Sequence, residues 1–155
     1  MTEGIVRAIF ICPIARAPMV QVESVEAIAG VGLKGDRYAE GRGSYNRDAI
    51  GKRQVTFINA NSFWGSDFTY ASTRRNIVTE GVELMYLIGK SFTVGGLEFF
   101  GVKYCDPCMI PSKLSGIPGF KERFHELGGL IAEVRTSGLI IVGCPIVSPA
   151  RNYDE

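Results

Sequence analysis

The sequence has little net charge, few cysteines and no hydrophobic run of membrane-spanning length. Seventeen basic against sixteen acidic residues give a formal net charge of +1, which offers no electrostatic attraction to nucleic acid or to an anionic membrane. The apolar run from Ile9 to Ile14 is far shorter than a membrane span, and the acidic first residues do not resemble a signal peptide. Four cysteines in 155 residues are too few for a disulfide framework, which favours a reducing compartment. We therefore expect a cytoplasmic protein with no nucleic-acid or membrane partner.

Glycine and short apolar segments, by contrast, are abundant. Nineteen glycines, seven prolines and 46% hydrophobic residues predict many short strands joined by tight turns. A chain of 155 residues can bury a core without metal or disulfide bonds. With no internal repeat and no second domain visible, we expect one mainly β domain over residues 1–155, with its core at about 4–147.

Alternation of apolar and polar residues locates the expected elements. Strands are predicted at residues 4–11, 19–28, 54–58, 129–135 and 139–143, and a hairpin at 91–94 and 97–103. A short helix is predicted at residues 82–89, and a weaker one after Asn61. Phe120, Phe124 and Leu127 have helical spacing within residues 118–128.

The stretch from Tyr104 to Leu114 carries the most chemistry, since it contains Cys105, Cys108 and Lys113. A thiol binds metal or attacks as the thiolate, which a nearby cation favours. Pro107 fixes a backbone dihedral next to Cys108, so we expect this thiol on a rigid loop. A second proline at position 111 and the Ser-Gly that follows argue for a loop there as well.

Four interpretations of Cys105-x-x-Cys108 remain open. A thioredoxin-like redox pair expects the motif to open a helix, and a zinc site needs two further ligands. Outside the motif, the only candidates for these further zinc ligands are the isolated residues Cys12, Cys144 and His125. A single-cysteine site is therefore favoured over a structural thiol, and both are favoured over zinc or dithiol redox chemistry.

Two further stretches are candidates for anion binding. Residues 30–37 hold three glycines in six residues, and the segment is either a turn or an anion-binding loop presenting Lys34 or Arg37. Taken alone, it favours the turn. Arg74 and Arg75 are either a surface pair or a fork for phosphate or carboxylate, with Asn76 beside them. The basic segment 41–53 is interpreted as an exposed loop whose charges are solvated.

Taken together, these segments resemble the MOSC family, named for the C-terminal domain of molybdenum-cofactor sulfurase. The resemblance extends from about residue 4 to residue 143. The matching segments, in the family's order, are Gly32-Leu33-x-Gly35-Asp36-Arg37, Val55-Thr56-Phe57-Ile58, Arg74-Arg75-Asn76-Ile77-Val78-Thr79, Gly81, Gly89, Gly95, Cys105-x-Pro107-Cys108 and Gly128-Gly129-Leu130-x-Ala132-x-Val134.

The resemblance implies a fold, a cofactor and an activity. The fold is a closed β-barrel of the pyruvate-kinase type with a few short helices, which places the protein in the mainly β (α+β) class. The cofactor is the molybdenum cofactor (molybdopterin), a pterin dithiolene with a terminal phosphate. Relatives of the mitochondrial amidoxime-reducing component use it to reduce N-hydroxylated compounds, and Cys108 matches the thiolate that binds their molybdenum.

The resemblance also assigns roles to individual residues. Cys108 is the expected metal ligand and Lys113 the cation that stabilises its thiolate. The expected cofactor-binding residues are Lys34, Asp36, Arg37, Arg74, Asn76 and Cys105. Asp36 would act by ordering an arginine rather than by touching the ligand.

Two departures from the family pattern leave the function open. Cys144 follows Gly143 where the family usually has aspartate, and His125-Glu126-Leu127 stands where an arginine is usual. The first hypothesis is a molybdenum-dependent oxidoreductase for N-hydroxylated substrates, supplied with electrons by a separate reductase. The second is a carrier of persulfide sulfur or of the cofactor, served by a cysteine desulfurase. The third is a non-catalytic anion-binding domain. A homodimer is compatible with each of them.

Overall fold

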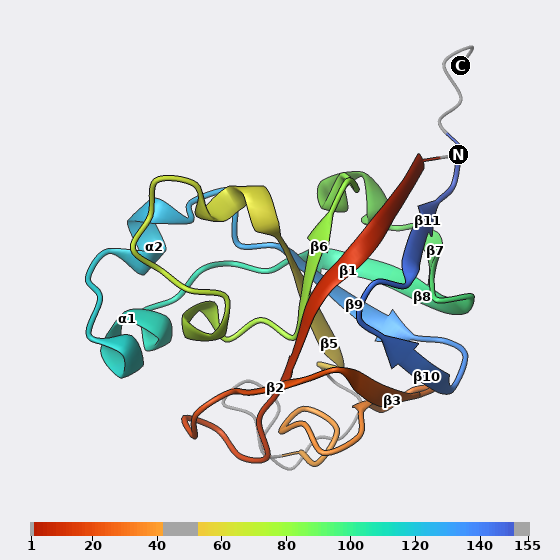
Figure 1. Ribbon diagram of the computed structural model, residues 1–155, viewed down its shortest axis with the longest axis horizontal. Coiled ribbons are helices and arrows are strands. Elements are labelled where there is room, and N and C mark those ends of the chain that lie inside the picture. The colour runs from red at the N-terminus through yellow and green to blue at the C-terminus, as the bar shows by residue number, and fades with distance from the viewer. Residues whose placement is uncertain (1, 42–52, 151–155) are drawn as a thin grey trace.

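A computed structural model, which describes residues 2–41 and 53–150, has a closed β-barrel at its centre (Figure 1). Neighbouring barrel strands are paired in the order β11-β7-β8-β9-β5-β6-β1, and β1 also pairs with β11, which closes the ring. The strands are β1 (Thr2–Ile11), β5 (Val55–Asn59), β6 (Ile77–Glu80), β7 (Ser91–Val94), β8 (Leu97–Tyr104), β9 (Leu130–Val134) and β11 (Pro145–Ser148). Of the paired strands in the described residues, only β5 and β6 run parallel to each other. The predicted closed barrel is confirmed.

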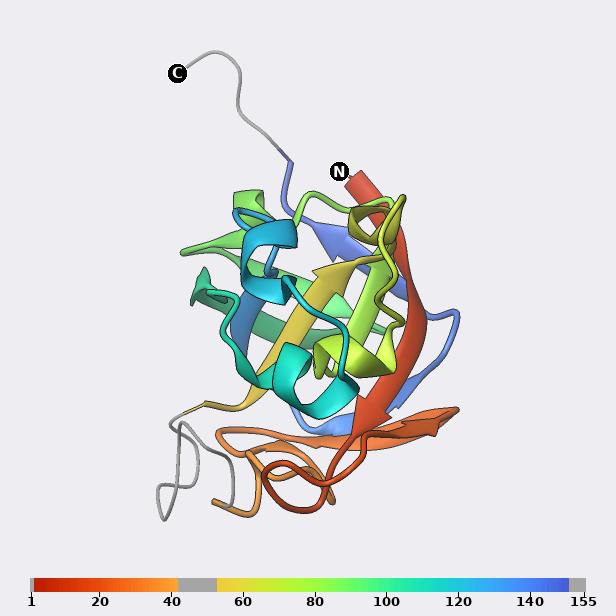
Figure 2. The same cartoon turned by 90° about the vertical axis from the view of Figure 1, so that its left-hand side faces the viewer.

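Strand β1 closes the barrel because it is long enough to pair on both edges. Its residue Ile5 lies opposite Glu80 of β6 on one side and Pro145 of β11 on the other. The end of β1 also pairs with the short strand β2 (Val20–Val22). A second, three-stranded sheet of β10 (Gly138–Ile141), β3 (Ser24–Ile28) and β4 (Gly32–Leu33) lies below the barrel in Figure 2.

The short helices gather beside the barrel, on the left of Figure 1. They are α1 (Ile110–Ser115) and α2 (Phe120–Arg123), with the 3₁₀ turns η1 (Ala60–Phe63) and η2 (Ala71–Thr73) near them; a third 3₁₀ turn, η3, spans Leu84–Leu87. Within residues 2–41 and 53–150, no helix is long and apolar enough to cross a membrane.

Two aromatic clusters fill the interior. Inside the barrel, the ring of Phe57 meets Phe92 and Phe99 edge-on, at centroid distances of 5.7 and 5.8 Å. Under the helices, Phe120 and Phe124 stack at 4.8 Å. Burying each of these rings contributes about 1.5–3 kcal/mol, so the second cluster fixes α2 and the loops around it to the barrel wall.

Most predicted strands are present, but four local expectations were wrong. The segment 19–28 forms two strands separated at Glu23, because β2 pairs with the barrel and β3 with the second sheet. The helix expected at 118–128 has only four residues, and Leu127 is 43% exposed rather than buried. The turn after Asn59 is 3₁₀ and has no side-chain cap. Strand β11 had not been expected.

The fourth error concerns the residues after Cys108. Position 111 was expected in a loop, but Pro111 lies in the first turn of α1. Proline is tolerated there because its missing N–H has no partner within the helix in any case. Gly116, with a φ of 77°, ends the helix. Cys108 itself lies in the loop between β8 and α1, as predicted.

Candidate functional site

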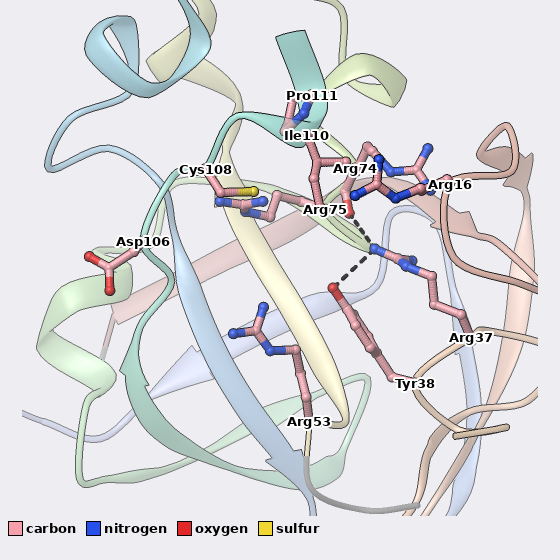
Figure 3. A pocket seen from close by; sticks show the side chains of 10 residues that line it. All are labelled: Arg16, Arg37, Tyr38, Arg53, Arg74, Arg75, Asp106, Cys108, Ile110 and Pro111. Carbon is pink, nitrogen blue, oxygen red and sulfur yellow. Dashed lines mark hydrogen bonds between the residues drawn. The ribbon is translucent and has the colours of Figure 1, made fainter. Parts of the chain in front are cut away.

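Loops at one end of the barrel surround a pocket lined by five arginines and one cysteine (Figure 3). The ten lining residues are Arg16, Arg37, Tyr38, Arg53, Arg74, Arg75, Asp106, Cys108, Ile110 and Pro111. The only carboxylate in this lining is that of Asp106, which is exposed and points away from the arginines in Figure 3. The pocket is partly open to solvent, and its cavity volume is about 30 Å³. The pocket is therefore suited to the small anionic part of a ligand.

A buried carboxylate holds the loop that carries Arg37. Asp36 is fully buried and accepts hydrogen bonds from the backbone N–H groups of Cys12 (2.9 Å) and Tyr38 (3.2 Å) and from Nη1 of Arg37 (3.1 Å). Burial raises the pKa of Asp36, and the charge of Arg37 and the two amides oppose that increase. Asp36, which had been predicted among the cofactor-binding residues, thus holds Arg37 and does not itself line the pocket.

Arg37 in turn connects two loops of the pocket. Its Nη2 donates to the hydroxyl of Tyr38 at 3.0 Å and to the backbone carbonyl of Arg74 at 3.1 Å, the two bonds dashed in Figure 3. Its guanidinium also lies 4.2 Å from the centroid of the Tyr38 ring. These contacts hold the guanidinium in place at the pocket wall.

Arg74 also lines the pocket and is held by contacts of its own. Its backbone is in the left-handed region, with a φ of 64°, where a non-glycine residue is strained by about 1–3 kcal/mol. Its side chain donates to the carbonyl of Ala17 at 2.8 Å and to the sulfur of Cys12 at 3.6 Å. Burial, and then the charge of Arg37, lower the pKa of Arg74. Cys12 is a buried structural thiol, as predicted.

Arg75 is held at two of its three nitrogens. Its Nε donates to the carbonyl of Gly128 at 2.7 Å and its Nη1 to the carbonyl of Thr73 at 3.2 Å. Its Nη2 is buried and has no hydrogen-bond partner within the described part of the chain. The guanidinium lies 5.7 Å from the ring centroid of Phe120, which connects the pocket to the aromatic cluster under the helices.

Cys108 is the only one of the four cysteines that lines this pocket. Its thiol is free and partly exposed, whereas Cys12 and Cys105 are buried. Cys144 is partly buried, and its sulfur would lie 3.2 Å from a Cβ added at Gly95 in the β7–β8 turn. Among residues 2–41 and 53–150, no three His, Cys, Asp or Glu side chains gather as a metal-binding group. The geometry therefore favours the single-cysteine interpretation.

Comparison with known protein families gives the same family as the sequence motifs. The MOSC domain family matches residues 49–147. The chain belongs to the MOSC domain family. No protein of curated function matches it.

Solved structures of similar fold cover nearly the whole chain. The YuaD protein from Bacillus subtilis is 16% identical with a TM-score of 0.76, over 94% of this chain and 97% of YuaD. YiiM from Escherichia coli is 16% identical with a TM-score of 0.65, over 98% of this chain and 71% of YiiM. YiiM from Geobacillus stearothermophilus gives the same identity and TM-score over 97% and 77%. At this identity the likeness shows the fold alone.

Within this MOSC domain, only some of the predicted site residues meet. Cys108, Arg37 and Arg74 line the pocket together. Lys34 does not line it: its side chain is 70% exposed and pairs with Glu26 at 3.6 Å. Lys113 is exposed on α1 and is also absent from the lining. Cys105 is buried, and its backbone N–H donates to Gly129.

Asn76 is fully buried behind the pocket rather than in it. Its Oδ1 accepts hydrogen bonds from the backbone N–H and the hydroxyl of Thr56, at 3.0 and 3.1 Å. Its Nδ2 donates to the carbonyl of Phe10 at 3.2 Å. The side chain thus joins β1 to β5 at the start of β6, and this role explains its burial without a ligand.

Seven of the ten lining residues had not been predicted as site residues: Arg16, Tyr38, Arg53, Arg75, Asp106, Ile110 and Pro111. Arg53 was interpreted as a solvated loop charge, but it is half-buried and lines the pocket with its guanidinium 5.8 Å from the ring centroid of Tyr38. The rest of that loop, residues 42–52, lies outside the described residues. Arg16 and Tyr38 gave no sequence signal. The Arg-Arg pair was the available signal for Arg75.

Proposed function

We propose that this MOSC domain binds the molybdenum cofactor and reduces N-hydroxylated compounds, with Cys108 as the thiolate ligand of the metal. The observation that supports the proposal is the position of one free, partly exposed thiol in a pocket lined by five arginines. Thiolate is a soft ligand suited to such a metal, and arginine is the usual partner of phosphate.

The residues present fit the cofactor in their donor chemistry. Arg37, Arg53 and Arg74 come from three different loops and would hold its terminal phosphate. Arg75 lines the same pocket and adds a fourth positive charge near the anion, which supports the proposal. Because the pocket is partly open to solvent, the bulky pterin would lie toward its open side and the phosphate toward the arginines.

Each part of the chain then has a defined task. Asp36 orders Arg37, and Arg37 positions the hydroxyl of Tyr38. Ile110 and Pro111 line the pocket close to Cys108 and would give the thiolate an apolar edge. When bound, the cofactor would supply a redox-active metal suited to oxygen-atom transfer, held by the Cys108 thiolate. Electrons would come from a separate reductase in the cytoplasm.

The test is reduction of an N-hydroxylated base by cofactor-loaded protein, with reduced viologen dye as electron donor. We expect dye oxidation that depends on substrate in the wild type and in Cys144→Ser, and loss of activity by at least about 100-fold in Cys108→Ser. Full activity in Cys108→Ser would overturn the proposal. Cys144→Ser is the matched control because it removes a partly buried thiol outside the pocket.

A second candidate function is a carrier of persulfide sulfur or of the cofactor. Partial exposure of Cys108 favours it, since a desulfurase must reach the thiol to load it. Such a protein would gain one sulfur atom on Cys108 when incubated with desulfurase and cysteine. It would show no turnover of N-hydroxylated compounds.

A further inference from the structure

A broad groove lies where the parallel strands β5 and β6 end. Asn59 is the last residue of β5 and Glu80 the last of β6, and the lining of the groove comes from β1, from the turn η1 and from the residues after β6. Its cavity volume is about 920 Å³, and it is partly open to solvent. It shares no lining residue with the pocket of Cys108, to which Arg74 and Arg75 contribute just before β6 begins. The two hollows therefore lie at opposite ends of β6.

Trp64, the only tryptophan of the chain, forms an exposed wall of this groove. It is 81% exposed, the largest exposed fraction of any large hydrophobic residue that the structure describes. Its backbone is nevertheless fixed, because its carbonyl accepts a hydrogen bond from Nη2 of Arg123 at 2.5 Å. The preceding Phe63 is buried against the rings of Tyr70 and Phe124. An indole ring held in solvent on such a rigid turn is typical of a residue that a partner protein buries.

The surface around Trp64 is large enough to contribute substantially to an interface. At 81% exposure its side chain offers roughly 200 Å², about a quarter of the area that one partner buries in a standard interface. Ile5 of β1 is 37% exposed and lies opposite Glu80, so it adds apolar surface beside the groove. The groove itself has room for an aromatic side chain from the partner.

The charges of the groove favour a second copy of the chain as this partner. Arg7 pairs with Glu80 at 3.6 Å, with both side chains half-exposed, and Glu83 belongs to the same lining. A face that carries both signs can meet an identical face with opposite charges opposed, whereas the arginine-lined end of the barrel would repel its own copy. The exposed ring and the groove also share one face. A twofold-symmetric interface requires this, because each copy must offer both the group that inserts and the space that receives it.

We propose that the chain forms a twofold-symmetric homodimer through this face, with Trp64 of each copy seated in the groove of the other. Arg7 of one copy faces the carboxylates of Glu80 and Glu83 of the second copy. Because the groove and the pocket of Cys108 lie at opposite ends of β6, the dimer leaves that pocket open. The inference is therefore independent of the proposed function.

The first experiment measures the mass of the wild type by sedimentation velocity over a range of concentrations. We expect dimers at about 100 μM and dissociation on dilution, as for a micromolar Kd. Since the chain has no other tryptophan, its fluorescence reports on Trp64 alone and should shift to shorter wavelength as the dimer forms. A wild type that is monomeric at about 100 μM would overturn the proposal. A dimer with the tryptophan emission of the monomer would overturn it too.

Matched substitutions of exposed apolar residues test the anchor. Trp64→Ala should raise the dimer Kd at least about 100-fold, because each dimer loses two anchors and one buried anchor of this kind accounts for about 30-fold or more. Leu139→Ala is the control, since Leu139 of β10 is 57% exposed but lies outside the groove, and its Kd should equal that of the wild type. Equal Kd values for Trp64→Ala and the wild type would contradict the proposed interface.

A charge exchange tests whether the partner is a second copy. Arg7→Glu makes every charged side chain of the groove lining negative, and Glu80→Lys combined with Glu83→Lys makes every one positive. Each variant alone should be monomeric, because two like-charged faces repel, and an equimolar mixture of the two should form mixed dimers. If another protein or a small molecule covers the groove instead, mixing restores no dimer and the proposal fails.

Discussion

Replacing Asn76 by alanine should destabilise the protein strongly, because this side chain joins three strands of the barrel. The substitution removes the two hydrogen bonds that Asn76 accepts from Thr56 and the one that it donates to Phe10, all in a fully buried setting. A lost bond that leaves a buried partner unsatisfied costs about 1–3 kcal/mol. Counting two or more such partners, we expect a loss of about 3–5 kcal/mol, a large part of the 5–15 kcal/mol typical of a domain.

Urea unfolding followed by circular dichroism measures this loss as a lower midpoint at unchanged slope. Asn61→Ala is the matched control, since Asn61 is exposed and should change stability by less than about 0.5 kcal/mol. Suppose instead that Asn76→Ala kept wild-type stability and lost bound cofactor. Asn76 would then be a ligand contact, as the family resemblance had suggested, and its assignment to the barrel framework would be wrong.

Three further predictions follow from burial, charge and backbone geometry. Iodoacetamide at pH 7 should modify Cys108 before Cys144, because burial raises the pKa of Cys144 and keeps it as the thiol; mass mapping measures the order. Burial raises the pKa of Asp36 above its ordinary value of 3.8, so ionisation of this carboxyl costs stability in the folded protein. Its contribution to the free energy of unfolding should therefore fall as the pH rises through and above 3.8. The fall should be smaller in Asp36→Asn, and urea unfolding at a series of pH values measures it. Gly129→Ala should lose about 3 kcal/mol or more in urea unfolding, since the φ of Gly129 is +104° and its Cβ would collide with the carbonyl of Phe57; a wild-type midpoint would contradict this.

Local pattern predicted most of the barrel strands but not how the barrel closes. Alternation locates the β7–β8 hairpin and the first half of β1, and the β-branched and apolar run of Val55 to Ile58 locates β5, which is buried on both faces. Strand β11 has only four residues and begins with proline, so its own sequence gives little signal. It exists because both β1 and β7 are available to pair with it. The sequence of a short segment does not reveal such long-range strand pairing.

Only part of the site was predicted, because its residues come together from distant parts of the chain. The sequence motif singled out Cys108, which lines the pocket, and Asp36 accepts a hydrogen bond from Arg37. Adjacent residues can face opposite ways, however, and the Arg74-Arg75-Asn76 triplet shows the consequence. The two arginines reach the pocket, whereas Asn76 is buried among the strands. Arg16 comes from a loop with no distinguishing composition, so only the folded chain reveals its contribution.

The most direct test of the central claim is the molybdenum and pterin content of protein expressed in a cofactor-producing host. Wild type, Cys108→Ser and Cys144→Ser would be purified in parallel and compared by elemental analysis and by fluorescence of the released pterin. The account predicts close to one molybdenum and one pterin per chain in wild type and Cys144→Ser, and loss of the metal in Cys108→Ser. Folded wild-type protein without either component, or Cys108→Ser with full molybdenum, would contradict it.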